Sequence, residues 1–157
     1  QNQNIDDVEI RGAEATAFLY LNENWAMKSS IAYATGKDTK TSRYLDTVDP
    51  VNIVNSLRYD NSSGNWGGEL FWTAVFDKTK VSSEDVTGAD RYQVLDLVGN
   101  LRFGDAISLR AGVFNIFDKK YARWQSIQGL NKITAADTIL NNYQPGTNFR
   151  LGLNASF

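Results

Sequence analysis

Two residue types that commonly do chemistry, histidine and cysteine, are absent from this chain of 157 residues. Without histidine the chain lacks the usual general base and the commonest ligand of transition metals and haem. Without cysteine it lacks disulfides and thiolate metal sites. Its aspartates and glutamates are spread among charged neighbours with no sign of a shared cleft. The residues therefore predict no enzyme, no resident cofactor and no metal site.

Aromatic and basic side chains in two long polar segments are the candidates for binding. Tyr121, Arg123 and Trp124 belong to the longer segment, and Arg43 and Tyr44 to an earlier one. Long loops tend to carry function, so these side chains could stack on a ligand or a protein partner. For the first three, packing of the loop on itself is an equally good interpretation, and for Arg43 and Tyr44 a structural role is favoured.

Asn115 and Asp118 stand where an apolar-polar alternation ends. They could contact a ligand. Both residue types also end strands through Asx-type turns, in which the side chain hydrogen-bonds the following backbone. The turn is the interpretation that we favour.

The elements that must position these residues are strands, because segments of the chain alternate apolar and polar side chains. The last segment is the most regular, with apolar residues at every second position from Phe149 to Phe157. Such strands suit a soluble core or a membrane barrel. No apolar run approaches the roughly 18 residues of a transmembrane helix. The alternation predicts strands over 8–21, 25–35, 51–59, 66–79, 91–103, 106–117 and 149–157.

The connections between these strands alternate strictly between short and long, as in outer-membrane barrels with tight periplasmic turns and long outer loops. The short ones are 22–24, 60–65 and 104–105, and the long ones are 36–50, 80–90 and 118–147. An odd number of strands starting outside and ending in the periplasm predicts that further strands precede Gln1. Residues 1–7 are then expected to be the tail of an outer loop.

Aromatic residues stand at both ends of the apolar faces. In tilted strands that climb roughly 2.4 Å per residue, the two sets lie ~20–25 Å apart, the height of a lipid-facing band between aromatic girdles. Aromatics scattered through a sandwich core are the alternative. Beside the short turns stand Trp25, Tyr59, Trp66, Phe103 and Phe157, and beside the long connections stand Tyr33, Phe76, Phe117 and Phe149.

The opposite faces carry charges, which a wide barrel can leave in water or against a plug. Arg58 and Glu69 are expected to meet across two strands on this inner face. The net charge of −2 gives no reason to expect nucleic acid as a partner.

The block Gly-Val-Phe-Asn-Ile-Phe-Asp-Lys-Lys-Tyr at 112–121 resembles a signature near the C-terminus of TonB-dependent outer-membrane receptors. As in that family, a long loop follows, then Tyr143-Gln144-Pro145-Gly146 and a last strand whose end at Phe157 resembles the family's assembly signal. The opening segment 8–14 also resembles a strand start of the family. After Pro145-Gly146 the family usually has an Arg, whereas this chain has Thr147, which puts a contact that usually anchors the loop in question. The motif residues carried by the resemblance are Asn115, Asp118, Tyr121, Pro145, Gly146 and Phe157.

The resemblance implies an all-β fold in which residues 1–157 are the last third of a 22-stranded antiparallel transmembrane β-barrel. The plug domain and earlier strands would lie outside this sequence. It also implies the outer membrane of a Gram-negative bacterium and ligand capture by the outer loops. The implied partners are outer-membrane lipid, the protein's own plug, and the TonB complex acting through that plug to energise uptake.

Segments 44–50, 57–60, 66–70 and 121–124 resemble the haem and haemoglobin receptor branch of the family. This resemblance implies that the transported iron-containing ligand is haem, either free or taken from an extracellular haem-carrier protein. A siderophore receptor of the same family is one alternative. A passive porin or small structural barrel is another, and a soluble lipocalin-like barrel is a third.

Overall fold

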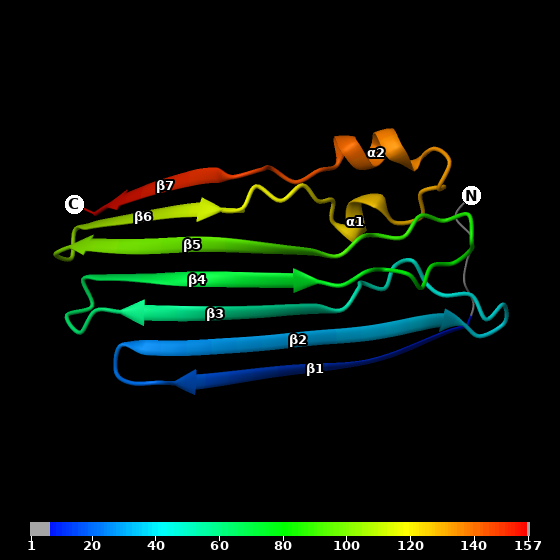
Figure 1. Ribbon diagram of the computed structural model, residues 1–157. Helices are drawn as coiled ribbons and strands as arrows, with labels where there is room; N and C mark the ends of the chain where they lie inside the picture. Colours follow the sequence, from blue (N-terminus) through cyan, green and yellow to red (C-terminus); the bar gives the residue numbers. More distant parts are fainter. Residues whose placement is uncertain (1–6, 157) are drawn as a thin grey trace.

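The computed structural model describes residues 7–156 and shows one sheet of seven antiparallel strands. Each strand pairs with its neighbours in the chain, so the order in the sheet runs from β1 to β7 (Figure 1). Both the all-β class and the number of strands are as predicted. The strands are β1 (Val8–Tyr20), β2 (Trp25–Asp38), β3 (Asn52–Asp60), β4 (Trp66–Val75), β5 (Tyr92–Phe103), β6 (Ile107–Phe114) and β7 (Asn148–Ala155).

Three predicted strand ends differ from the structure by three or four residues and were wrong. β2 continues past 35 to Asp38, because it stays paired with β1 as far as Val8. β4 stops at Val75 rather than 79, because Lys78 instead forms a bridge with Ala89 in the following connection. β6 stops at Phe114 rather than 117, because Asn115 takes a left-handed backbone conformation with φ of 51°.

The last long connection contains two short helices that the sequence pattern did not predict, α1 (Trp124–Ile127) and α2 (Ala135–Asn141). Within residues 7–156, no helix has both the length and the apolar character needed to cross a membrane. Residues 1–6 of the predicted loop tail (1–7) and the terminal aromatic Phe157 lie outside the described residues.

The register places the predicted apolar positions of neighbouring strands opposite one another. One continuous row runs across five strands through the pairs Leu57↔Leu70, Leu70↔Leu97, Leu97↔Val113 and Val113↔Phe149. Since side chains alternate between the two faces of a sheet, all these residues lie on the same face. We call this surface the apolar face.

On the other face, Arg58 lies directly opposite Glu69, as predicted. The Arg58 guanidinium, however, forms its ion pair within its own strand, with the carboxylate of Asp60 at 2.6 Å. Both groups are more than two-fifths exposed, so the pair contributes little stability.

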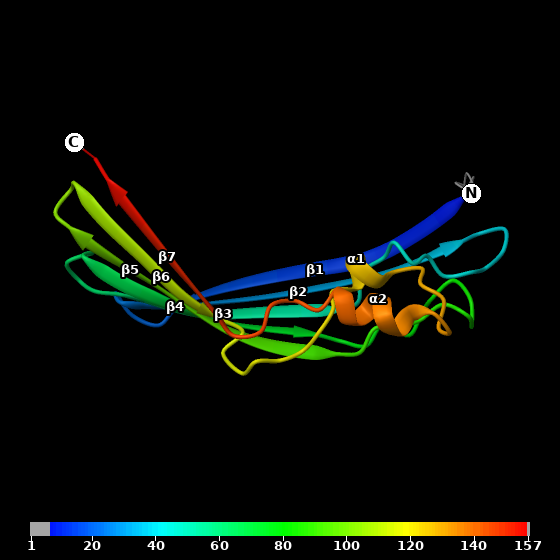
Figure 2. The same ribbon diagram turned by 90° about the horizontal axis from the view of Figure 1, so that it is seen from above.

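All three short turns lie at one end of the sheet and all three long connections at the other, together with both helices (Figure 1). The view from above shows that the sheet is twisted and bowed rather than flat (Figure 2). β1 and β7 are its two edges, so the sheet is open in the part of the chain that the structure describes. The molecule therefore presents two separate surfaces for function: the apolar face and the packed long connections.

Candidate functional site

The apolar face is exposed along its whole width. Leu97 near its centre is 45% exposed, and Phe149 and Leu151 on the edge strand are each 76% exposed. Apolar patches of this extent mark contact with a membrane or with another protein. They are rare on the solvated surface of a soluble monomeric domain.

Aromatic side chains form a cluster at the short-turn end of this face. The Tyr59 ring lies between Trp25, at a centroid distance of 4.9 Å, and Trp66, at 5.0 Å. The predicted aromatics at the opposite end, among them Phe76 and Phe117, are also exposed. Aromatic rings at two levels with aliphatic side chains between them match the girdles and band of a lipid-facing wall.

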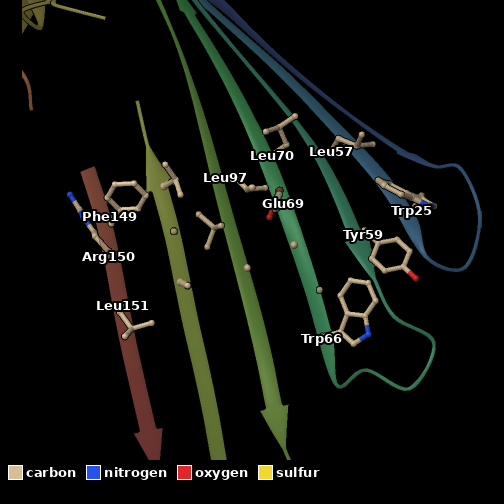
Figure 3. Close-up of a pocket in the computed structure, with 17 residues that line it drawn as sticks. Trp25, Leu57, Tyr59, Trp66, Glu69, Leu70, Leu97, Phe149, Arg150 and Leu151 are labelled. Atoms are coloured by element: carbon tan, nitrogen blue, oxygen red, sulfur yellow. The ribbon is translucent and has the colours of Figure 1, made fainter. Parts of the chain in front are cut away.

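A groove of about 950 Å³ crosses the middle of the apolar face (Figure 3). Gly68, Gly99 and Ala111 lie next to one another in register and leave the sheet nearly bare there. In Figure 3, Leu57, Leu70 and Leu97 lie further from the turn between β3 and β4 than Tyr59 and Trp66 do. The groove exists because glycine and alanine have little or no side chain to fill this part of the face.

The three long connections pack into one unit at the other end of the sheet. Trp124 of α1 is only 2% exposed, and its indole Nε1–H donates to the backbone carbonyl of Asp46 at 2.7 Å. The Asp46 carboxylate in turn accepts hydrogen bonds from the backbone N–H (2.8 Å) and the hydroxyl (2.6 Å) of Ser82. These bonds join the first, second and third long connections. The core of this unit, here called the loop core, consists of Ala122, Trp124 and Ile127 packed against Val81, Ala89, Leu130 and Ile139.

Lys78 is a buried cation beside the loop core. It is 7% exposed, and its ammonium lies 5.6 Å from the centroid of the Trp124 ring. Burial lowers the pKa of this ammonium, an effect that the carboxylates of Asp46 and Asp49 oppose.

Of the residues predicted to bind a ligand, two are held in packing contacts. Trp124 is buried in the loop core, and Tyr121 stacks on Tyr92 with ring centroids 4.1 Å apart. Tyr44 is half-buried between the ammonium groups of Lys37 and Lys80, which lie 4.7 and 5.7 Å from its ring. Arg43 and Arg123 are exposed. A ligand-binding role for these five residues stays a prediction.

The motif residues at the end of β6 form a turn, here called the Asn115 cluster. Asn115 is 4% exposed; its side-chain oxygen accepts from the backbone N–H of Lys119, and its amide donates to the carbonyls of Lys119 and Pro145. The backbone N–H of Thr147 donates to the Asp118 carboxylate at 3.1 Å, and the Thr147 hydroxyl donates to the Asn115 carbonyl at 2.9 Å. Thr147 therefore anchors the end of the last connection although it is not the usual Arg.

A pocket of about 600 Å³ between the second and third long connections was not predicted. Its lining combines tyrosines and aliphatic side chains with five basic residues from two segments about 40 positions apart: Lys78, Arg91, Lys119, Lys120 and Lys132. We call it the cationic pocket. The adjacent residues Lys119 and Lys120 are visible in the sequence, but the motif at 112–121 that contains them gives no indication of a pocket.

Comparison with known proteins gives a family model described as "TonB dependent receptor-like, beta-barrel", which matches residues 1–116. Hemoglobin-binding protein A of Haemophilus influenzae is 23% identical over all of this chain and 18% of its own length. Hemoglobin-haptoglobin utilization protein B of Neisseria meningitidis serogroup C is 25% identical over 93% of this chain and 20% of its own length. The chain therefore spans about a fifth of these curated relatives.

Two solved structures have the same fold over nearly the whole chain. The copper transporter OprC superposes with a TM-score of 0.82 at 27% identity, covering 96% of this chain and 24% of its own. The ferric enterobactin receptor PfeA, solved in complex with BCV-L6, superposes with a TM-score of 0.75 at 24% identity, covering 98% of this chain and 23% of its own. The second likeness concerns the fold alone.

Proposed function

This chain belongs to the TonB-dependent receptor family, and from that premise we propose that it forms the C-terminal part of an outer-membrane receptor that imports haem. The observation that carries the choice of ligand is the similarity, over the whole chain, to a protein named for binding haemoglobin. The family consists of transport receptors rather than enzymes. We propose no enzymatic activity for this chain and no cofactor held by it.

The apolar face supports a place in the wall of an outer-membrane barrel in a Gram-negative bacterium. Its exposed leucines would contact lipid tails, and the Trp25–Tyr59–Trp66 cluster would lie at one interface. Because the sheet of the described residues is open at β1 and β7, it needs neighbouring strands on both sides to close. In this proposal residues 1–157 are one part of the barrel, the plug lies elsewhere in the protein, and TonB acts through the plug.

The packed long connections support ligand capture at the outer end. They form a surface built from all three connections, with its own core and the buried cation Lys78. In this proposal that surface receives haem, either free or from an extracellular haem-carrier protein.

A receptor for a different metal complex is the second candidate. The observation that favours it is the likeness to the copper transporter OprC, which is 27% identical with a TM-score of 0.82. A siderophore receptor belongs to this same candidate class.

Growth on defined iron sources separates import of haem from import of a ferric siderophore. The full-length receptor is expressed in an iron-starved Gram-negative strain that lacks its own haem and siderophore receptors, with or without a functional TonB. We expect growth on haemin or haemoglobin only when TonB is functional. Growth on ferric siderophores alone would favour the second candidate, and growth on haemin without TonB would contradict energised uptake.

A further inference from the structure

The cationic pocket lies between two connections that the backbone holds firmly together. Val86 and Asn131 form a β-bridge. On either side of that bridge, the N–H of Thr87 donates to the carbonyl of Leu130, and the N–H of Lys132 donates to the carbonyl of Asp85, both at 2.8 Å. The pocket is therefore a built part of the loop unit, and its volume of about 600 Å³ suits a small organic ligand.

The lining of the pocket is strongly positive. The lining contains five basic residues and two acidic ones, Asp77 and Asp90, so it carries a net charge of +3 in a chain whose net charge is −2. One of these carboxylates is already engaged, because Asp77 accepts a hydrogen bond from the backbone N–H of Arg91 at 2.7 Å. Concentrated charge of one sign in a concave site attracts a ligand of the opposite sign.

None of the five basic side chains forms an ion pair within residues 7–156. Arg91, Lys119, Lys120 and Lys132 are exposed, so their charged ends are free to meet a ligand. Lys119 takes part in the Asn115 cluster only through its backbone N–H and carbonyl, which leaves its ammonium available.

The rest of the lining is apolar or aromatic. Ile127 and Ile139 belong to or pack on the loop core, and Tyr121 and Tyr143 contribute rings. The Tyr121 ring is held in place by its stacking on Tyr92. The pocket thus offers a fixed apolar wall together with exposed cations, which is complementary to a ring-containing body that carries acidic groups.

We propose that the cationic pocket binds an organic dicarboxylate with a flat apolar body, the chemistry of a porphyrin with its two propionates. Lys119, Lys120 and Lys132 contact the carboxylates, and the tyrosines and isoleucines contact the ring. This assignment rests on the proposed function, and it names the part of the outer surface that recognises the ligand and the acidic groups that are recognised.

The test is a titration of the purified full-length receptor in detergent with haemin and with the dimethyl ester of haemin, followed by absorbance. The ester has the same ring but no carboxylates. The variant combines Lys119→Gln, Lys120→Gln and Lys132→Gln. The matched control combines Lys28→Gln, Lys37→Gln and Lys40→Gln, which lie on β2 or in the first long connection, outside the two connections that form the pocket. Circular dichroism and heat-resistant mobility on gels report whether each variant is folded.

We expect the pocket variant to bind haemin about tenfold more weakly and to bind the ester as the unchanged receptor does, because three exposed ion pairs are lost. The control should bind both within about twofold of the unchanged receptor. Haemin binding that is the same in the pocket variant, or equally reduced in the control, would overturn the proposal. If the titration overturns the proposal but the unchanged receptor still supports growth on haemin, only the pocket assignment fails. If the unchanged receptor does not support growth on haemin, the proposed function itself is refuted.

Discussion

Arginine in place of Leu97 directly tests whether the apolar face contacts lipid. Leu97 is 45% exposed and lies between Leu70 and Val113 on the neighbouring strands. An arginine there would project into the centre of the aliphatic band. No carboxylate lies directly across either neighbouring strand, because both cross-strand partners are apolar.

The size of the expected loss of stability follows from the depth of residue 97 in the membrane. Leu97 lies about six residues from Phe103 at the short-turn end, or roughly 14 Å along the membrane normal in a band of ~20–25 Å. At that depth an arginine on a lipid-facing strand costs about 2–4 kcal/mol, and near the interface about 0–1 kcal/mol. Leu101 lies on the same strand and face but only ~5 Å from the level of Phe103, so Leu101→Arg is the matched control.

The assay is urea unfolding of the full-length receptor in lipid vesicles, followed by tryptophan fluorescence and extrapolated linearly to water. We expect Leu97→Arg to lower the free energy of unfolding by about 2–4 kcal/mol and Leu101→Arg by about 1 kcal/mol or less. Equal losses at both positions would refute the lipid assignment, since a charge placed in a soluble core is costly wherever it is buried. An unchanged stability of Leu97→Arg would refute it as well.

Three further substitutions test the packed connections. Gly146→Ala places a methyl group against the Asp118 carboxylate, which must turn away and lose its hydrogen bond from the backbone N–H of Thr147. That loss should cost about 1 kcal/mol in thermal unfolding. Gly152→Ala, whose new methyl group meets nothing within 4 Å, should be close to neutral, and equal effects would contradict the turn geometry. Trp124→Phe removes the indole N–H and leaves the partly buried carbonyl of Asp46 without this hydrogen bond. The long connections should then be cleaved about tenfold faster in limited proteolysis. Unchanged cleavage would show that this bond does not join them. Burial holds the pKa of Lys78 below its ordinary 10.5, so the folded loops bind this proton less tightly than the unfolded chain does. Loop stability should therefore rise with pH in the window below 10.5. Lys78→Met should remove that rise in thermal unfolding measured between about pH 8 and 10, and a rise that persists in the variant would show that other groups cause it.

The strands could be predicted because each must satisfy two different environments. A period of two from Phe149 onward has one physical explanation, a strand with unlike faces, and neighbouring strands must share a register for their apolar faces to coincide. The strand ends were harder to predict. The end of β6 depends on the left-handed backbone of Asn115, which no periodicity reveals.

The two short helices and the cationic pocket could not be predicted because they depend on contacts between distant segments. α1 has only four residues and is held by the burial of Trp124, whose hydrogen-bond partner lies 78 positions earlier in the chain. A helix of that length has no stability of its own. For the same reason the sequence left open whether Trp124 binds a ligand or packs its loop, since the answer depends on where Asp46 lies.

The packing of the long connections has a consequence for binding. Loops that were separately mobile would lose conformational freedom when a ligand ordered them, and that loss would weaken binding. Here the bond from Trp124 to Asp46 and the bridge between Val86 and Asn131 hold the walls of the cationic pocket before any ligand arrives. Trp124 itself does not line the pocket in the described structure. Trp124→Phe should therefore weaken haemin binding without removing a ligand contact, and it should weaken binding of the dimethyl ester to the same extent, because preorganisation supports the apolar wall and the charged rim alike.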